Sequence, residues 1–205
     1  MSPRPSKVTD DDVFAAARRA MAHRGPRELT LAHIAGEAGV TAGRLVQRYG
    51  SKSDLLLALS AQFAGGAGLR FADLRRQARP PLAVLRAYVD GMASLAPTPE
   101  ALARNLAYLQ LDLADPRSRR HLVEHARSVR REIEALVREA VASGALSAAC
   151  RPARLARAID TAISGSLMTW ACYQEGSARA WLRTDLDAVL APYRVGRASR
   201  TAARR

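Results

Sequence analysis

The chain is short of the residues on which several classes of protein depend. It has two cysteines, Cys150 and Cys172, which are too few for a disulfide framework and lack the Cys-x-x-Cys spacing of a metal or redox site. Its longest uncharged stretches, residues 55–69 and 161–174, fall short of the roughly 20 residues that a membrane-spanning helix needs. The N-terminus also has no apolar segment of the kind that signal peptides contain. We therefore expect a cytoplasmic protein with reduced thiols and no membrane partner.

Strand-forming residues are scarce as well. Aromatic residues make up 5% of the chain, and no stretch keeps the alternation of apolar and polar residues that is typical of a strand. Signals for helix starts are frequent instead, because proline suits the first turn of a helix and stands at positions 81, 99, 116 and 152. The clearest predicted helix covers residues 116–143 and ends at Gly144. The sequence thus predicts an all-α fold of about nine helices.

Lysine is nearly absent, yet the chain is strongly basic through its arginines. Its 32 basic and 19 acidic residues give a net charge of +13, which favours a polyanionic partner, nucleic acid first and an anionic membrane surface second. A membrane-surface protein would need a long basic amphipathic helix with aromatic anchors, and the sequence shows none. The preference for arginine over lysine is most simply explained by a GC-rich coding bias.

Residues 30–52 contain the pattern that says most about function. A first short helix starts after Thr30 as N-cap and ends at Gly39, where glycine adopts a left-handed conformation at no steric cost. A second short helix starts after Thr41 and turns Leu45 inward. Two helices joined by a glycine-containing turn form the helix-turn-helix layout. The second helix of such a unit enters the major groove of DNA.

The outward face of the second helix carries groups that suit DNA. Arg44 can donate two hydrogen bonds to guanine, and Gln47 can make two with adenine. Gly43 lets the backbone approach a phosphate, and Lys52 lies at the start of the next helix, where its ammonium and the positive helix end would act on a phosphate together. The alternative is that Arg44, Gln47 and Arg48 only solvate a surface helix. The predicted DNA-binding residues are Thr30, Thr41, Ala42, Gly43, Arg44, Gln47, Arg48, Tyr49 and Lys52.

A longer pattern extends over residues 13–55. The pattern consists of an apolar leading helix, then T-x-x-x-I-A, G-V-T-x-G-x-L, an aromatic residue and S-K-x-x-L. The residues that form it are Val13, Phe14, Ala17, Met21, Thr30, Ile34, Ala35, Gly39, Val40, Thr41, Gly43, Leu45, Tyr49, Ser51, Lys52 and Leu55. This pattern resembles the DNA-binding domain of the TetR family of bacterial transcriptional regulators. Two positions depart from the family: Val46 stands where a phosphate-holding Tyr is usual, and Ala42 where Lys or Arg is frequent. Both departures remove contacts with the DNA backbone.

The resemblance implies two domains. Residues 1–52 would form a helix-turn-helix DNA-binding domain with an N-terminal arm, and residues 53–195 a helical effector-binding and dimerisation domain joined through the fourth helix. Residues 196–205 form a basic tail that we expect to be disordered. The last two helices, predicted over 153–175 and 178–193, would pair with those of a second copy, although packing within one chain could bury the same faces. The candidate lining residues of the effector pocket, which suit an ordinary core better than a ligand contact, are Tyr88, Met92, Tyr108, Trp170 and Tyr173.

These features predict a homodimeric transcriptional repressor with no enzymatic activity and no cofactor. It would occupy a near-palindromic DNA operator until a small-molecule effector releases it. One alternative is an effector-independent helix-turn-helix DNA-binding protein. A less favoured one is a helical metal-dependent enzyme using His121, Glu124 and His125, since their H-x-x-E-H string occurs in inverted zinc proteases. Nothing in the chain announces a third ligand, and the arginines at 119, 120 and 127 would repel a dication.

Overall fold

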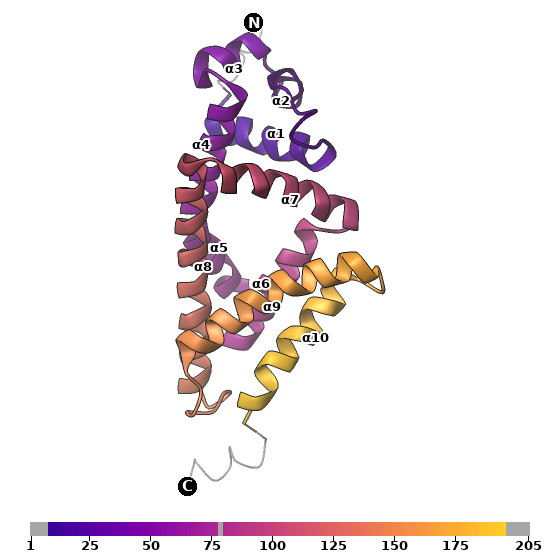
Figure 1. The fold of residues 1–205 in the computed structure, drawn as a ribbon. Helices are drawn as coiled ribbons and strands as arrows, with labels where there is room; N and C mark the ends of the chain where they lie inside the picture. Colours follow the sequence, from indigo (N-terminus) through magenta and orange to yellow (C-terminus); the bar gives the residue numbers. More distant parts are fainter. Residues whose placement is uncertain (1–7, 78–79, 196–205) are drawn as a thin grey trace, which may run out of the picture. The chain divides into compact units, whose positions relative to one another are not determined.

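The computed structural model describes residues 8–77 and 80–195, and over these residues the chain is helical and has no strand (Figure 1). The predicted N-terminal arm and the tail of residues 196–205 lie outside the described residues. The described helices are α1 (Asp10–His23), α2 (Leu31–Ala38), α3 (Ala42–Tyr49), α4 (Lys52–Gly65), α5 (Ala67–Gln77), α6 (Pro81–Leu95), α7 (Pro99–Ala114), α8 (Pro116–Ala142), α9 (Pro152–Tyr173), α10 (Ala178–Leu190) and the 3-10 helix η1 (Ala191–Tyr193). The all-α prediction is confirmed.

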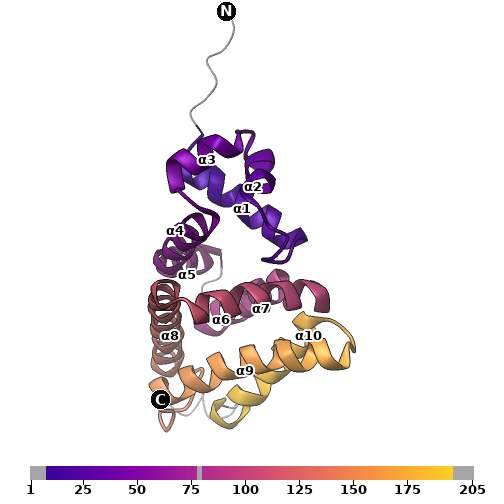
Figure 2. The same cartoon turned by 45° about the horizontal axis from the view of Figure 1, so that its top comes forward.

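The chain forms two compact units. The N-terminal unit consists of the chain up to Phe63 together with Ala103–Leu122, and the C-terminal unit consists of Ala64–Leu102 and the chain from Val123 onward. Within the N-terminal unit, α1, α2 and α3 lie side by side (Figures 1 and 2). This unit takes in more of the chain than the predicted DNA-binding domain of residues 1–52, because parts of α4, α7 and α8 belong to it.

The first helices begin and end where local chemistry satisfies their free backbone groups. Thr9 and Asp12 form a capping box at the start of α1, in which the Thr9 hydroxyl accepts from the Asp12 N–H and the Asp12 carboxylate accepts from the Thr9 N–H. The Thr9 hydroxyl also donates to the Asp12 carboxylate at 2.7 Å, and this hydrogen bond, followed by the one from the Thr9 N–H, holds the pKa of Asp12 below its usual value. Gly39 ends α2 in the left-handed region, with φ of 67°.

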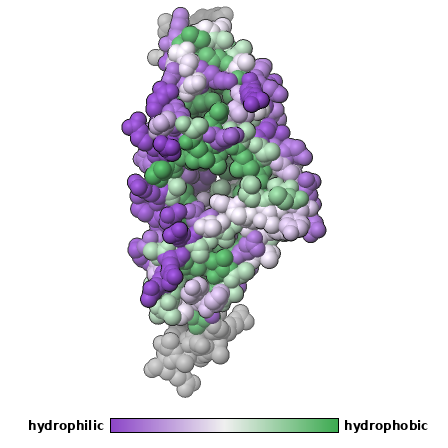
Figure 3. Space-filling view, in the orientation of Figure 1, coloured by the Kyte–Doolittle hydropathy of each residue, from purple (hydrophilic) through white to green (hydrophobic). Residues whose placement is uncertain are grey.

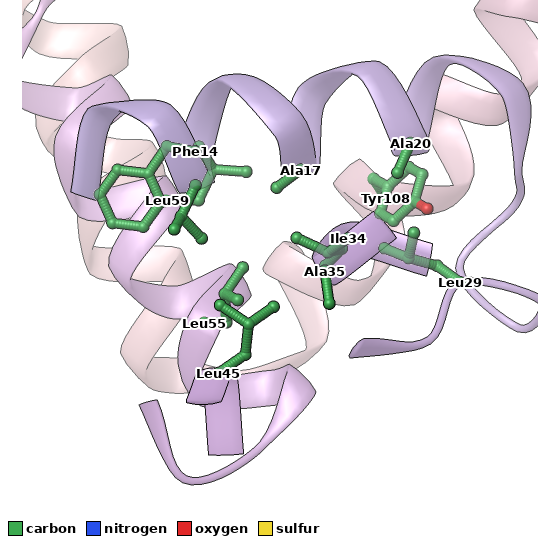
Figure 4. Packing of buried hydrophobic residues seen from close by; sticks show 11 residues of the cluster. Phe14, Ala17, Ala20, Leu29, Ile34, Ala35, Leu45, Leu55, Leu59 and Tyr108 are labelled. Atoms are coloured by element: carbon green, nitrogen blue, oxygen red, sulfur yellow. The ribbon is translucent and has the colours of Figure 1, made fainter. Parts of the chain in front are cut away.

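The hydrophobic cluster of the N-terminal unit joins five helices (Figure 4). Phe14 of α1 lies near Leu59 of α4 at one end, whereas Tyr108 of α7 lies with Ala20 and Leu29 at the other. The buried members are Val13, Phe14, Ala17, Ala20, Leu29, Ile34, Ala35, Leu45, Leu55, Leu59 and Tyr108. The helix-turn-helix segment is therefore held by a core that α4 and α7 complete.

The described residues contain ten α-helices where the sequence predicted about nine. The additional helix results from an interruption at Gly66, which separates α4 from α5. Glycine weakens a helix interior by about 1 kcal/mol relative to alanine, and residues 65, 66 and 68 are all glycine. The break between α4 and α5 thus falls within this glycine-rich segment.

In the C-terminal unit, α9 packs against α10, and α10 also packs against α6. The ring of Phe71 in α5 stacks on that of Tyr88 in α6, with the centroids 4.7 Å apart. The Asp90 carboxylate of α6 accepts from both Nε and Nη2 of Arg183 in α10, at 2.7 and 2.5 Å. Packing within one chain already buries apolar side chains of the last two helices, namely Leu155, Ile159, Ile163, Leu167, Trp170, Leu182, Leu186 and Leu190.

The surface of the chain is unevenly polar. Hydrophilic residues gather along the side where α8 lies (Figure 3), in line with its exposed arginines Arg119, Arg120, Arg127, Arg130, Arg131 and Arg138. Over the described ranges, no single helix has the length and apolar character needed to cross a membrane, and α4 with α5 passes that test only as a bent pair.

Candidate nucleic-acid interface

The turn between α2 and α3 has the geometry that the sequence predicted. The Thr30 hydroxyl accepts from the N–H of His33 at 3.2 Å, and the Thr41 hydroxyl accepts from the N–H of Arg44 at 3.3 Å, so each threonine caps the helix that follows it. The N–H of Gly39 donates to the carbonyl of Ala35, which ends the first helix. These contacts define a helix-turn-helix unit, as predicted.

One face of α3 is buried and the rest is open. Leu45 exposes only 1% of its surface, whereas Arg44, Val46 and Gln47 are exposed. A Cβ atom added at Gly43 would meet nothing within 4 Å, so this part of the helix has no close neighbour in the described chain. Within the described ranges, the side chains of Arg44 and Gln47 form no hydrogen bond or ion pair with other residues. These two side chains are therefore available for an external partner.

Arg48 and Tyr49 are held differently, by contacts with the start of α1. Arg48 donates from Nη1 to the carbonyl of Val8 at 2.8 Å, and its Nη2 lies 2.8 Å from the carboxylate of Asp10. The Tyr49 hydroxyl also donates to Asp10, and its ring lies 6.0 Å from that of Phe14. Burial, and secondarily the hydrogen bond with Asp10, raise the pKa of Tyr49 to about 12. Both side chains brace the end of α3 against α1.

Lys52 is engaged by the loop between α1 and α2. Its Nζ donates to the carbonyls of Pro26 and Leu29, at 3.0 and 2.8 Å. An ammonium has three donors, so one remains for another acceptor. Sequence spacing placed Lys52 at a helix start but gave no indication of this loop contact, which links residues 23 and 26 positions apart.

The residues predicted for an effector pocket do not all lie in the same unit. Tyr88 and Trp170 are buried in the C-terminal unit, Met92 is half-buried there, and Tyr173 is 64% exposed and stacks on Trp181. Tyr108 instead lies in the core of the N-terminal unit and donates from its hydroxyl to the carbonyl of Arg24 at 2.9 Å. Core packing thus accounts for Tyr108, which belongs with the helix-turn-helix unit rather than with the other four residues.

The H-x-x-E-H string lies on α8, with His121 and His125 half-buried and Glu124 exposed. Over residues 8–77 and 80–195, no group of three or more His, Cys, Asp and Glu side chains is arranged to hold a metal ion.

The fold and the exposed face of α3 define a helix-turn-helix DNA-binding protein. Residues 13–59 match the family described as bacterial regulatory proteins, tetR family. Residues 102–186 match the family described as tetracyclin repressor-like, C-terminal domain. The two matches together cover more than half of the chain, and the chain belongs to the TetR family of transcriptional regulators. It therefore combines a DNA-binding domain with a ligand-binding domain.

Solved structures of the family share this fold. SmeT, the repressor of the Stenotrophomonas maltophilia multidrug efflux pump SmeDEF, is 21% identical, with a TM-score of 0.65 over 93% of each chain. A TetR transcription regulator from Haloarcula marismortui is 17% identical, with a TM-score of 0.70 over 91% of this chain and 98% of that one. The fatty acid degradation regulator FadR from Bacillus halodurans is 18% identical, with a TM-score of 0.66 over 92% and 97%. No curated protein matches the sequence.

Proposed function

We propose that this protein is a cytoplasmic transcriptional repressor that binds a near-palindromic operator as a homodimer and leaves it when a small molecule binds. The observation that carries the DNA part is the open face of α3, where Arg44 and Gln47 are exposed and unengaged within the described chain. A guanidinium and an amide on a helix that fits the major groove are the groups that read guanine and adenine. Repression by occupying the operator requires no catalytic residue.

The proposed base recognition by Arg44 and Gln47 is tested on a DNA duplex that the full-length protein selects from a random pool. Arg44→Ala and Gln47→Ala should each weaken binding to that duplex by about 1–3 kcal/mol and relax selectivity at one base position. Arg131→Ala and Gln110→Ala remove the same side-chain types from exposed positions on α8 and α7 and should leave affinity unchanged. Equal losses on every sequence would instead assign Arg44 to the phosphates, and a pool without an enriched sequence would contradict the proposed operator.

The other predicted DNA-binding residues would act around these two. Thr30 and Thr41 have hydroxyl protons that remain available to phosphates, and Gly43 leaves the backbone open. Ala42 packs partly against the hydrophobic cluster. Contacts of Arg48, Tyr49 and Lys52 with DNA stay a prediction, because most of their donors already serve to hold α3 and the α1–α2 loop.

The homodimer would use the faces of α9 and α10 that the C-terminal unit leaves exposed. These faces consist mostly of small side chains, which let helices approach closely: Thr161, Ser164, Gly165, Met168 and Cys172 on α9, and Ala180, Thr184 and Ala188 on α10. A two-fold dimer presents the same surface from both copies and places two reading helices about one DNA turn apart. Such a dimer accounts for the expected near-palindromic operator.

A bulky side chain at Gly165 tests this interface. A Cβ there meets nothing within 4 Å, so the single chain accommodates Gly165→Arg while a closely packed second copy does not. We expect the variant to be monomeric by sedimentation and to lose operator binding. Gly91→Arg on α6, where a Cβ is equally free, should remain dimeric. A dimeric Gly165→Arg variant would move the interface elsewhere.

The effector part rests on the ligand-binding domain of the family and on apolar residues of the C-terminal unit. SmeT has been solved in complex with triclosan, and we propose a similarly small and largely apolar molecule for this chain. Tyr88, Met92, Trp170 and Tyr173 are the candidate contacts. A thermal-shift screen of small apolar compounds should find one that raises the unfolding temperature by mass action and releases DNA. If stabilising compounds never release DNA, an effector-independent DNA-binding protein is the better description.

A further inference from the structure

Val46 is an apolar side chain that α3 presents to solvent. It exposes 48% of its surface, whereas its neighbour Leu45 exposes 1%. Of the α3 positions three or four away, which share its side of the helix, Gly43 carries no side chain, and Ala42 and Tyr49 pack against the hydrophobic cluster. Val46 is therefore exposed on α3, as are Arg44 and Gln47.

Packing within the chain does not account for this valine. The hydrophobic cluster of the N-terminal unit includes Val40, Ala42 and Tyr49 from the same segment, but Val46 is not one of its members. A β-branched residue also has a lower helix propensity than alanine, leucine or lysine, so Val46 does not favour α3 locally. The exposed Val46 thus stabilises neither the core nor the helix.

The major groove offers one group that suits an exposed apolar side chain, the C5-methyl of thymine. Valine is short, so it reaches the bases only if the helix backbone lies deep in the groove. Gly43, one turn earlier, allows that approach because it has no side chain and no close neighbour. The Val46 side chain has no hydrogen-bond donor for a phosphate, so the contact it can make with DNA is an apolar one.

We propose that Val46 determines sequence specificity by contacting the methyl group of a thymine in each half of the operator. The proposal rests on the proposed function, because it requires α3 to lie in the major groove. Adjacent Cα atoms are 3.8 Å apart and successive bases rise 3.4 Å along a strand. The thymine therefore lies within one or two base pairs of the adenine that Gln47 reads.

Deoxyuridine tests the contact, since it replaces thymine without the methyl group and keeps base pairing. The probe is a duplex selected from a random pool by the full-length protein, with each thymine replaced singly. We expect one thymine per half-site at which the replacement weakens binding about fourfold, the equivalent of one buried methylene. Val46→Ala should bind the unmodified duplex more weakly and lose sensitivity to that replacement.

Two variants serve as controls. Val123→Ala makes the same substitution at an exposed valine of α8, 43% exposed, and should keep the full methyl sensitivity. Arg44→Ala should bind the selected duplex less tightly but should also keep its sensitivity to loss of the thymine methyl group. Circular dichroism verifies the fold of each variant, and alanine at an exposed helix position favours that fold.

The outcomes separate this proposal from the proposed function. A pool that yields no enriched sequence contradicts the operator itself. An enriched duplex that tolerates deoxyuridine at every thymine, or a Val46→Ala variant that retains the wild-type sensitivity, overturns the role of Val46 alone. The role of Val46 is likewise overturned if Val46→Ala weakens binding equally to the thymine duplex and to the deoxyuridine duplex.

Discussion

Asp10 holds together the region of the N-terminal unit from which α3 is presented. Its carboxylate contacts Nη2 of Arg48 and accepts from the Tyr49 hydroxyl, while Arg48 also reaches the carbonyl of Val8. Thr9 followed by three aspartates is a helix-start signal in the sequence, and Thr9 does cap α1. The bracing of α3 links residues 38 and 39 positions apart, which no helical spacing rule predicts. The local helix cap can therefore be predicted from the sequence, whereas the contacts of Asp10 with Arg48 and Tyr49 cannot.

Lys52 has two possible contributions that experiment can separate. Its Nζ donates to two carbonyls of the α1–α2 loop, and one donor remains for a phosphate. Lys52→Met keeps the stem but removes the charge, so the free energy of unfolding should fall by about 1–3 kcal/mol as the loop carbonyls lose a charged donor. The slope of log affinity against log salt should also fall by about 0.9 per half-site.

Urea denaturation without DNA and titration of one duplex at several salt concentrations measure these effects independently. A change in slope with unaltered stability would contradict the loop contact. A change in stability with an unaltered slope would show that Lys52 positions the loop and does not bind phosphate.

At the scale of elements, α7 acts as part of the helix-turn-helix unit. Tyr108 donates to the carbonyl of Arg24 at 2.9 Å, and Arg104 donates from Nε to the carbonyl of Ala22 at the same distance. Both carbonyls belong to the end of α1, where the last groups have no partner within the helix. Burial raises the pKa of Tyr108 to about 12, so its hydroxyl remains a donor at neutral pH. α7 thus completes both the core and the hydrogen bonding of α1.

Substitutions at Tyr108 distinguish core packing from a pocket role. Tyr108→Phe keeps the ring and should cost about 1 kcal/mol through the lost hydrogen bond, whereas Tyr108→Ala should cost about 3–5 kcal/mol by removing the buried ring. Tyr173→Phe, at an exposed tyrosine, should leave stability unchanged. Urea denaturation measures all three. A Tyr108→Ala variant of nearly wild-type stability that loses effector response would favour the pocket role first predicted.

Element boundaries illustrate what sequence patterns can and cannot reveal. Thr30, Gly39 and Thr41 mark helix ends through chemistry confined to a few residues, and the structure has them where predicted. The glycines at 65, 66 and 68 weaken a helix, but this tendency alone does not specify that the helix breaks at Gly66. The apolar faces of α9 and α10 were recognised, but periodicity alone does not distinguish a partner helix in the same chain from one in a second copy.

At the scale of the whole molecule, more than half of the net positive charge lies outside the described residues. Residues 1–7, 78–79 and 196–205 contain seven of the 32 basic residues and none of the 19 acidic ones. The described residues therefore carry 25 basic and 19 acidic side chains, a net charge of +6 out of +13. Val46 and Ala42 also have no side-chain donor for a phosphate. Non-specific attraction to DNA must then come largely from basic residues away from α3.

The four arginines of residues 196–205 provide the sharpest test of that view. Changing all four to glutamine in the full-length chain should lower the slope of log affinity against log salt by at least about 0.9 per half-site, and by about 3.6 per half-site if every arginine neutralises a phosphate. Affinity should fall alike for the selected operator and for an unrelated duplex, because phosphate contacts carry no sequence information. Titrations of both duplexes at several salt concentrations measure this. An unchanged slope would leave Lys52, the N-terminal arm and the surface arginines as the source of attraction. A loss confined to the operator would mean that the tail reads bases.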